Sequence, residues 1–257
     1  MLSSQVNYNS IGIMNIFLRS MLLALSLGAT MSVFADDMEE FKKVFAERFP
    51  KFTLTHVEKT PIDDVFLAVV SGQVIYMTKD GRYMFDGNLV DLKSRKNYTD
   101  EAMAGIRLQE LNTLGEDNMI VYTPKKVKHT ITVITDVDCP YCRKLHDEMD
   151  GYMASGIKVR YVFMPLKGHA DYTKTVSIWC SDDQNEALDM AKAGAEIEPK
   201  KCDNPIDEHL AVARNLGVNG TPAIILQNGQ LLAGYVPVAK LAAELDRLQL
   251  SAATEMH

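Results

Sequence analysis

The sequence predicts an α+β protein with a small strand-rich N-terminal domain, a connecting helix and a larger C-terminal domain. Three observations predict this division. Short strand-like runs separated by turn signals fill residues 36–98, one helical stretch covers residues 99–117, and strand and helix patterns alternate through residues 118–257. We take these ranges as the expected domain boundaries.

The first 35 residues have the pattern of a cleavable export signal. Arg19 precedes an apolar stretch over residues 21–34, and Ala35 stands directly before an acidic start. This order is typical of secretory signals, and the apolar core is too short to cross a bilayer, which disfavours the alternative of a membrane anchor. We expect residues 1–35 to be removed from a soluble, exported protein, and Met14 is a possible true start.

Composition and charge narrow the function classes. The 257 residues carry a formal net charge of −7, whereas nucleic-acid binding requires a basic face, so no nucleic-acid partner is expected. The six histidines stand apart from any G-x-S-x-G or H-E-x-x-H pattern, which argues against the common hydrolases. We expect no cofactor.

Residues 36–98 predict one short helix followed by strands. The helix is indicated by four apolar residues on one face, Phe41, Val44, Phe45 and Phe49. Asp80 and Gly81 between two strand-like runs predict a hairpin. Because about 60 residues with few helices make a poor independent core, we expect this domain to need a partner surface.

The next stretch predicts a helix that Thr99 caps and Gly115 ends. Its apolar residues form only a loose stripe, namely Met103, Ile106, Leu111 and Leu114. Such weak amphipathicity favours a linker helix over a core helix.

The C-terminal domain predicts a thioredoxin fold. A βαβ unit is indicated by the patterns of residues 119–122, 130–135, 140–154 and 157–164. A helical stretch from about Asp171 to Leu216 follows, and two short strands joined by an Asn228-Gly229 turn precede a closing helix. A βαβ half, a helical insertion and a ββα half together make this fold.

The four cysteines all lie in the C-terminal half, at Cys139, Cys142, Cys180 and Cys202. In an oxidising compartment two disulfides are the default. Cys139 and Cys142 form a C-x-x-C motif where a strand gives way to a helix. Unpaired backbone N–H groups and the helix dipole at that point favour the Cys139 thiolate, which indicates a redox-active pair.

The neighbours of Cys139 suit this chemistry with one exception. Pro140 fits the first helical turn, and Cys142 on the same helix face should resolve rather than attack. We expect Tyr141 to tune the site and contact substrate. Asp138 is the exception, because its negative charge should raise the pKa of Cys139.

Other interpretations of the cysteines are weaker. Their spacing does not supply four zinc ligands, so we expect no metal, and an inert C-x-x-C bridge would remove little unfolded-state entropy. Cys180 and Cys202 would close a loop of about 23 residues, worth roughly 3 kcal/mol, which indicates a structural disulfide; a second redox relay is the alternative. We place His146 on the helix surface and His169 in a loop of unknown role.

Four segments carry a family resemblance: HTITVITDVDCPYCRKLH, Trp179-Cys180 with Cys202, LGVNGTPAIIL and NGQLLAGY. Together they resemble the DsbC/DsbG family of periplasmic thiol:disulfide isomerases. The resemblance implies a V-shaped homodimer joined through the N-terminal domains. It also implies a cleft for misfolded disulfide-containing proteins and a membrane reductase of the DsbD type that keeps the active cysteines reduced.

Carried over by position, Cys139 is the nucleophile, Cys142 resolves, and Thr221 and Pro222 form a cis-prolyl loop whose backbone pairs with a substrate chain. The implied activity is that of a protein disulfide isomerase and reductase. Pro140 departs from the family's usual glycine, and this position tunes redox poise. A dithiol oxidase and a non-catalytic periplasmic chaperone are the alternatives.

Overall fold

The computed structural model describes residues 37–166 and 172–255, with side chains described as far as residue 251. The chain divides into two compact units. The first unit comprises the residues up to 70 together with residues 75–86, and the second comprises residues 71–74 together with those from 87 onwards. The predicted export signal and His169 lie outside the described residues.

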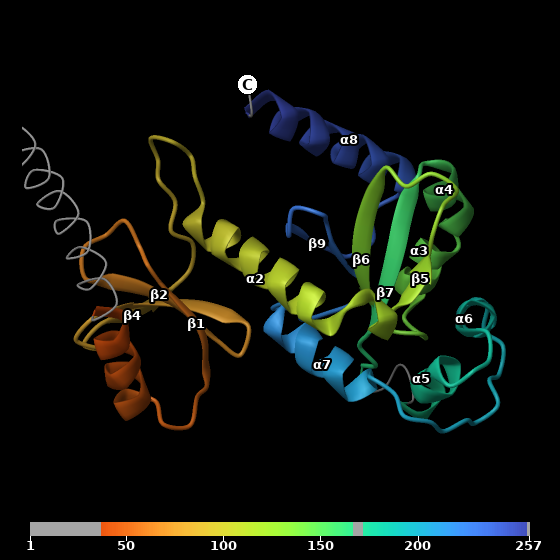
Figure 1. Ribbon diagram of the computed structural model, residues 1–257, viewed down its shortest axis with the longest axis horizontal. Helices are drawn as coiled ribbons and strands as arrows, with labels where there is room; N and C mark the ends of the chain where they lie inside the picture. Colours follow the sequence, from red (N-terminus) through yellow and green to blue (C-terminus); the bar gives the residue numbers. More distant parts are fainter. Residues whose placement is uncertain (1–36, 167–171, 256–257) are drawn as a thin grey trace, which may run out of the picture. The chain divides into compact units, whose positions relative to one another are not determined.

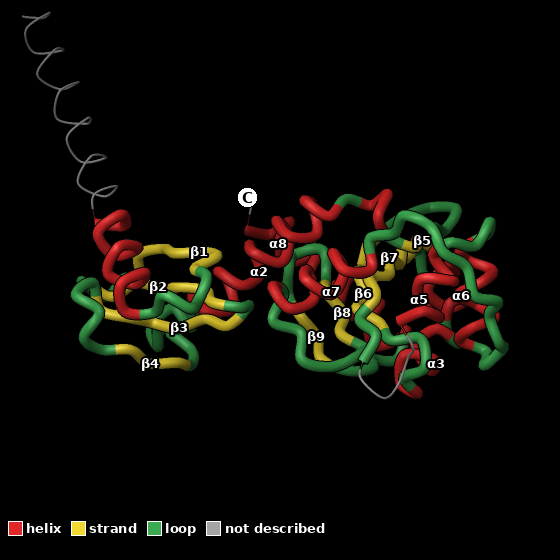
Figure 2. The backbone as a smooth tube through the Cα atoms, turned by 90° about the horizontal axis from the view of Figure 1, so that it is seen from below, coloured by secondary structure: helices red, strands yellow, loops and turns green. Residues whose placement is uncertain are grey.

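The first unit is an antiparallel sheet with strands in sequence order (Figure 2). Its strands are β1 (Leu54–Lys59), β2 (Val65–Val70), β3 (Gln73–Thr78) and β4 (Met84–Asp86). The hairpin predicted at Asp80 and Gly81 is confirmed, since β3 pairs with β4 and Gly81 adopts φ +66°. All three residues of β4, at the edge of the sheet, are exposed.

A helix over residues 37–48 covers one face of this sheet. Phe41 and Phe45, which the sequence placed on one helix face, are buried, and Phe41 stacks on Phe66 of β2 with ring centroids 4.6 Å apart. The core of the first unit is small and built largely from these aromatic rings.

The second unit contains a five-stranded sheet in the order β5-β7-β6-β8-β9, whose strands are labelled in Figure 2 and whose surrounding helices are labelled in Figure 1. Its strands are β5 (Ile120–Tyr122), β6 (His129–Thr135), β7 (Ile157–Phe163), β8 (Ala223–Ile225) and β9 (Leu231–Ala233). The predicted βαβ unit is confirmed, because β6 and β7 run parallel while the other pairs are antiparallel.

Helices cover both faces of this sheet. They are α2 (Tyr98–Leu114), α3 (Pro140–His146), α4 (Met149–Ala154), α5 (Tyr172–Trp179), α6 (Gln184–Lys192), α7 (Ile206–Asn215) and α8 (Val238–Glu255), with a short η1 (Glu116–Asn118) after α2. Strand residues alternate between two clusters, so Val133 faces the cluster that contains α3, α4 and α8, whereas Ile134 faces α2 and α7. This alternation buries both faces of the sheet, and every residue of β6 except Thr130 is buried although the strand contains one histidine and three threonines.

Helix α2 packs into the second unit more closely than its weak amphipathicity predicted. Leu111 and Leu114 belong to the buried cluster with α7, and Arg107 donates to the carbonyl oxygens of Leu216 (3.2 Å) and Gly229 (3.3 Å). The expectation that this helix is not part of a core is therefore wrong for its second half.

Two local expectations for the helices are also wrong. Asn97, not Thr99, caps α2, because the Thr99 hydroxyl accepts the N–H of Leu89 at 2.9 Å. The single helix expected over residues 140–154 is two helices, with the break at residues 147 and 148, where Glu148 has the non-helical backbone angles of an N-cap and its carboxylate accepts the N–H of Val238 at 2.8 Å.

The observed α+β architecture, with a strand-rich first unit and a thioredoxin-like sheet that carries a helical insertion (α5 to α7), agrees with the predicted fold class. Among the described helices, none combines the length and the apolar character needed to cross a membrane.

Candidate active site

Cys139 lies at the N-cap of α3, directly after the loop that follows β6. Its backbone is extended, Pro140 occupies the first turn, and the Arg143 N–H donates to the Cys139 carbonyl oxygen at 3.0 Å. Neither cysteine of the motif is part of a disulfide, and both are buried, with Cys139 7% and Cys142 1% exposed. The strand-to-helix junction thus leaves only Cys139 near the surface.

The Asp136 carboxylate holds the loop before the motif. One oxygen accepts the N–H groups of Asp138 (2.8 Å) and Cys139 (3.2 Å), and the other accepts the N–H of Leu166 (2.8 Å). Sequence reasoning missed this residue, although an aspartate three residues before a helix N-cap is a signal for such a turn.

The pKa of the Cys139 thiol lies below its ordinary value. Burial alone would raise this pKa, but hydrogen bonds to the charged form from Thr221, from Cys142 and from the N–H of Tyr141 outweigh it. This agrees with the expected thiolate at a helix N-terminus.

The sequence predicted that the negative charge of Asp138 would oppose the Cys139 thiolate, but in the structure this charge is compensated. Its carboxylate pairs with Arg143 (2.5 Å) and with Lys174 of α5 (2.8 Å). Burial would raise the pKa of Asp138, but Lys174 and Arg143 together hold it below its ordinary value. Two cations therefore compensate one anion, and the sequence could not reveal this because Lys174 belongs to the helical insertion.

The Thr221-Pro222 loop lies beside the motif. The peptide bond between these residues is cis, and the Cys139 thiol donates to the Thr221 carbonyl oxygen at 3.4 Å. The Thr221 hydroxyl is buried and has no partner among the described residues. When Cys139 ionises it can no longer donate to the carbonyl, and the free hydroxyl can then donate to the sulfur instead.

Cys142 has the opposite character. Burial raises the pKa of its thiol above the ordinary value, although the positive charge of Lys192 opposes that rise. Next to it along the chain, Tyr141 is 62% exposed and its ring is open to solvent. The motif thus combines one stabilised thiolate, one inward thiol and one exposed aromatic ring.

The other two cysteines are joined in a disulfide. Cys180, directly after α5, is bonded to Cys202 in the loop before α7, with Cα atoms 5.7 Å apart. The bond links the end of α5 to the loop between α6 and α7.

His146 is not the surface residue that the sequence predicted. It is buried, with Nδ1 3.1 Å from the Tyr161 hydroxyl and Nε2 2.9 Å from the carboxylate of Asp189 on α6. The Tyr122 hydroxyl donates to the same carboxylate at 2.5 Å. Helix α6 covers this side of α3, which the sequence did not show.

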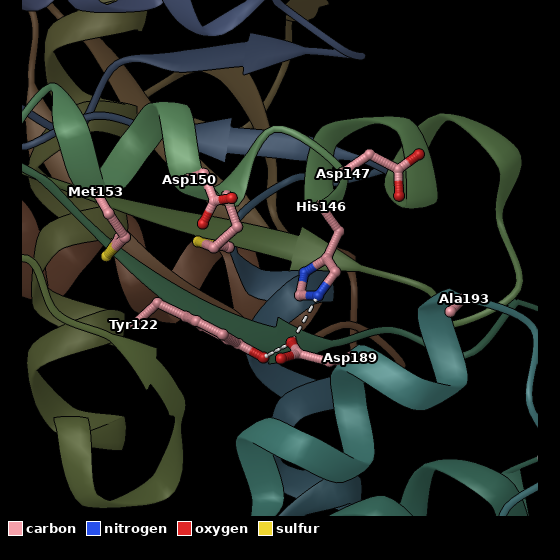
Figure 3. A pocket seen from close by; sticks show the side chains of 8 residues that line it. Tyr122, His146, Asp147, Asp150, Met153, Asp189 and Ala193 are labelled. Atoms are coloured by element: carbon pink, nitrogen blue, oxygen red, sulfur yellow. Dashed lines mark hydrogen bonds and ion pairs between the residues drawn. The ribbon is translucent and has the colours of Figure 1, made fainter.

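Tyr122, His146 and Asp189 border a cavity of about 390 Å³. Figure 3 shows the Asp189 carboxylate facing both the Tyr122 hydroxyl and the His146 ring. Burial lowers the pKa of His146, and the Asp189 carboxylate only partly restores it. Among the described residues, no three histidine, cysteine or carboxylate side chains are grouped to hold a metal ion.

Family models match both parts of the chain. Residues 32–100 match the family described as "Disulfide bond isomerase protein N-terminal domain", and residues 116–249 match "Thioredoxin-like domain". A solved disulfide interchange protein from Neisseria gonorrhoeae is 28% identical, with a TM-score of 0.47, over 52% of this chain and 96% of that one.

Curated relatives cover most of both chains. The thiol:disulfide interchange protein DsbC of Escherichia coli K12 is 39% identical over 75% of this chain and 81% of its own length. DsbC of Haemophilus influenzae is 31% identical over 89% of this chain and 98% of its own length. The resemblance predicted from the sequence is thereby confirmed, and the chain belongs to the DsbC family of thiol:disulfide interchange proteins.

Proposed function

We propose that the protein reshuffles wrong disulfides in exported proteins by thiol–disulfide exchange, as an isomerase and reductase. One observation carries this proposal: the Cys139 thiol, with its lowered pKa, stands at a helix N-terminus one turn from the inward Cys142 thiol, whose pKa is raised. The thiolate is the form that attacks a disulfide, so a lowered pKa favours attack by Cys139 and a raised pKa disfavours attack by Cys142.

The steps follow from these two thiols. The Cys139 thiolate attacks one sulfur of a wrong disulfide, a mixed disulfide forms, and the other substrate sulfur leaves as a thiolate. A substrate thiol can then displace Cys139, which leaves a rearranged substrate and a reduced protein. If this step stalls, Cys142 attacks Cys139 and releases the substrate reduced, and the protein is left with a Cys139–Cys142 disulfide.

The substrate site that we propose is formed by Thr221 and Pro222 with Tyr141. An extended substrate chain can pair with the Thr221 backbone as an added strand, and the exposed Tyr141 ring belongs to the residue two positions after the attacking Cys139. Pro140 would tune the redox poise, and the Cys180–Cys202 bond would be structural.

A homodimer is supported by the first unit. Its small core leaves large apolar side chains exposed. Met84 and Phe85 lie on the edge strand β4, Tyr83 directly precedes it, and Ile62 follows β1. An open strand edge with an apolar surface suits pairing with a second copy. We propose that residues 36–98 dimerise, residues 99–117 connect, and residues 118–257 catalyse.

The protein's place in the cell follows from the same proposal. A cleavable signal over residues 1–35 would deliver it to the periplasm, where misfolded disulfide-containing proteins are its substrates. Because isomerisation needs a free Cys139 thiolate, a reductase must keep the motif reduced, and the family resemblance points to a DsbD-type membrane protein.

The proposal is tested by trapping the mixed disulfide. With Cys142→Ser the release route is absent, so the variant should accumulate covalent complexes with a scrambled protein, linked through Cys139. Mass mapping identifies the linked cysteine. A complex linked through another cysteine, or complexes with Cys139→Ser in equal amount, would overturn the assignment.

A further inference from the structure

Lys192, the last residue of α6 in the helical insertion, is buried beneath the C-x-x-C motif. It is 2% exposed, and its ammonium group donates to the Thr135 hydroxyl and to the Asp136 carbonyl oxygen, both at 2.8 Å. Lysine is almost never this buried unless its charge is paired. Its position therefore calls for a negative partner.

No carboxylate forms an ion pair with Lys192 within the described part of the chain. The Asp136 carboxylate contributes at longer range, but both of its oxygens accept main-chain N–H groups. Burial lowers the pKa of Lys192 to about 8. Among the groups that oppose this decrease, the charge of Cys142 has the largest effect. The thiolate of Cys142 is thus the natural counter-charge.

Thr135 joins the two groups. Its oxygen accepts a hydrogen bond from Lys192, so its own hydrogen is free to be donated to another acceptor. Burial has the largest effect on the pKa of Cys142 and raises it. The charge of Lys192 is the strongest influence that lowers this pKa, and the Thr135 hydroxyl also lowers it. Thus the hydroxyl that Lys192 contacts at 2.8 Å also favours the charged form of Cys142.

The remaining charged groups around Lys192 are few. The Cys139 thiolate also favours the charged form of Lys192, whereas the positive charge of Arg143 disfavours it. His146 faces the same helix, and the positive charge of Lys192 contributes to the lowered pKa of that imidazole after burial. Neither side chain is placed to replace Lys192 at Cys142, since Arg143 pairs with Asp138 and the His146 ring contacts Asp189.

We propose that Lys192 is a positioning residue for the release step: acting through Thr135, it stabilises the Cys142 thiolate that frees a substrate from the mixed disulfide. The inference rests on the proposed role of Cys142 as the resolving thiol. It assigns to the helical insertion a part in the redox chemistry besides its structural one.

The release step balances as follows. Cys142 loses a proton and its sulfur bonds to Cys139, while the bond between Cys139 and the substrate sulfur breaks. That substrate sulfur leaves as a thiolate and takes up a proton, so no net proton is consumed. The substrate is reduced by two electrons and the protein is oxidised by two.

The experiment is stopped-flow reaction of the reduced, full-length protein with a limiting amount of dithiobis-nitrobenzoate, whose thiolate is coloured. Attack by Cys139 releases one dye thiolate, and release through Cys142 gives the second in a slower phase that does not depend on protein concentration. Cys142→Ser should show the first phase alone. If the wild-type protein shows no second phase, the proposed function itself fails, whatever Lys192 does.

Lys192→Met removes the charge and keeps a chain of similar length. We expect the second phase to slow about tenfold at neutral pH with little change in the first. At alkaline pH, where Cys142 ionises in both proteins, the rates should converge, which a purely structural defect would not produce. Lys240→Met, at an exposed lysine of α8, is the matched control and should leave both phases unchanged.

A second pair of variants covers the case in which Lys192→Met does not fold. Thr135→Ser keeps the hydroxyl and should keep the wild-type second phase, whereas Thr135→Val removes the hydroxyl and should slow it. A normal second phase in folded Lys192→Met, an equal loss of rate at every pH, or equal rates in the two Thr135 variants would overturn the inference while leaving the proposed function intact.

Discussion

The sulfur of Cys139 lies 3.4 Å from the carbonyl oxygen of Thr221, which is 82 residues later in the chain. The two halves of the thioredoxin-like sheet meet at this contact, one supplying the nucleophile at the end of β6 and the other the cis-prolyl loop before β8. The Thr221 hydroxyl, buried and without a partner among the described residues, is therefore available to the thiolate.

Thr221→Val should raise the pKa of Cys139, because the hydroxyl that favours its charged form is lost. A hydrogen bond to a charged group is worth about 1.5–3 kcal/mol, so the reduction potential should fall by about 30 mV or more. The absorbance of the thiolate as a function of pH measures the first effect, and equilibration with glutathione measures the second. Thr221→Ser keeps the hydroxyl and should stay near wild type; an unchanged pKa in Thr221→Val would exclude this role.

Pro140→Gly should shift the reduction potential while leaving the fold intact. Proline restricts the first turn of α3, and its removal changes the relative stability of the thiolate and the disulfide. A shift of 30 mV corresponds to about 1.4 kcal/mol, and a change of less than about 10 mV would remove this residue from the account of redox tuning. Circular dichroism checks that the variant is folded.

Stability should decrease as the pH falls from about 6.5 to about 4 because of His209. Its Nε2–H donates to the Asn118 carbonyl oxygen (2.6 Å) and its Nδ1 accepts the N–H of Phe163 (3.1 Å), so the neutral ring is held on both sides. Burial lowers the pKa of His209 to about 4, below its unfolded value of 6.5.

Since the unfolded chain binds the proton first, the stabilisation is fully present above pH 6.5 and is lost as the pH approaches 4, amounting to about 3 kcal/mol. Urea unfolding at several pH values measures it. His209→Gln should be less stable at neutral pH and show a smaller decrease over this interval. An identical pH dependence in the variant would contradict the assignment.

Met84→Lys should convert a dimer into a folded monomer. Met84 is 55% exposed on the edge strand β4, and a lysine on an open edge opposes pairing between strands. The monomer should still react with small disulfides and lose most of its activity on scrambled proteins. Light scattering reports the oligomeric state, with Leu250→Lys on α8, at a leucine that is 70% exposed, as the control. A monomeric wild-type chain would contradict the proposal.

The local features of the site could be predicted, and the long-range ones could not. The strand-to-helix position of Cys139 follows from the motif and from the restricted φ of Pro140, which act within a few residues. The paired state of Asp138 depends on Lys174, and the burial of His146 depends on Asp189, and both partners lie on insertion helices far along the chain.

Lys192 shows the same limit. Nothing in its neighbouring sequence distinguishes it from a solvated lysine at a helix end, and only the packing of α6 against the end of β6 places it beneath Cys142. Likewise Asn97 and Thr99 are both good helix caps by composition, and the contact of Thr99 with Leu89 decides between them.

The central claim is that Cys139 performs disulfide exchange, and recovery of activity in a scrambled multi-disulfide protein tests it most directly. Wild-type protein should restore the native disulfides, Cys142→Ser should restore them partly while covalent complexes accumulate, and both Cys139→Ser and the double variant should restore none above background. Full recovery with Cys139→Ser and Cys142→Ser combined would show that the protein acts as a non-catalytic chaperone and would contradict the account.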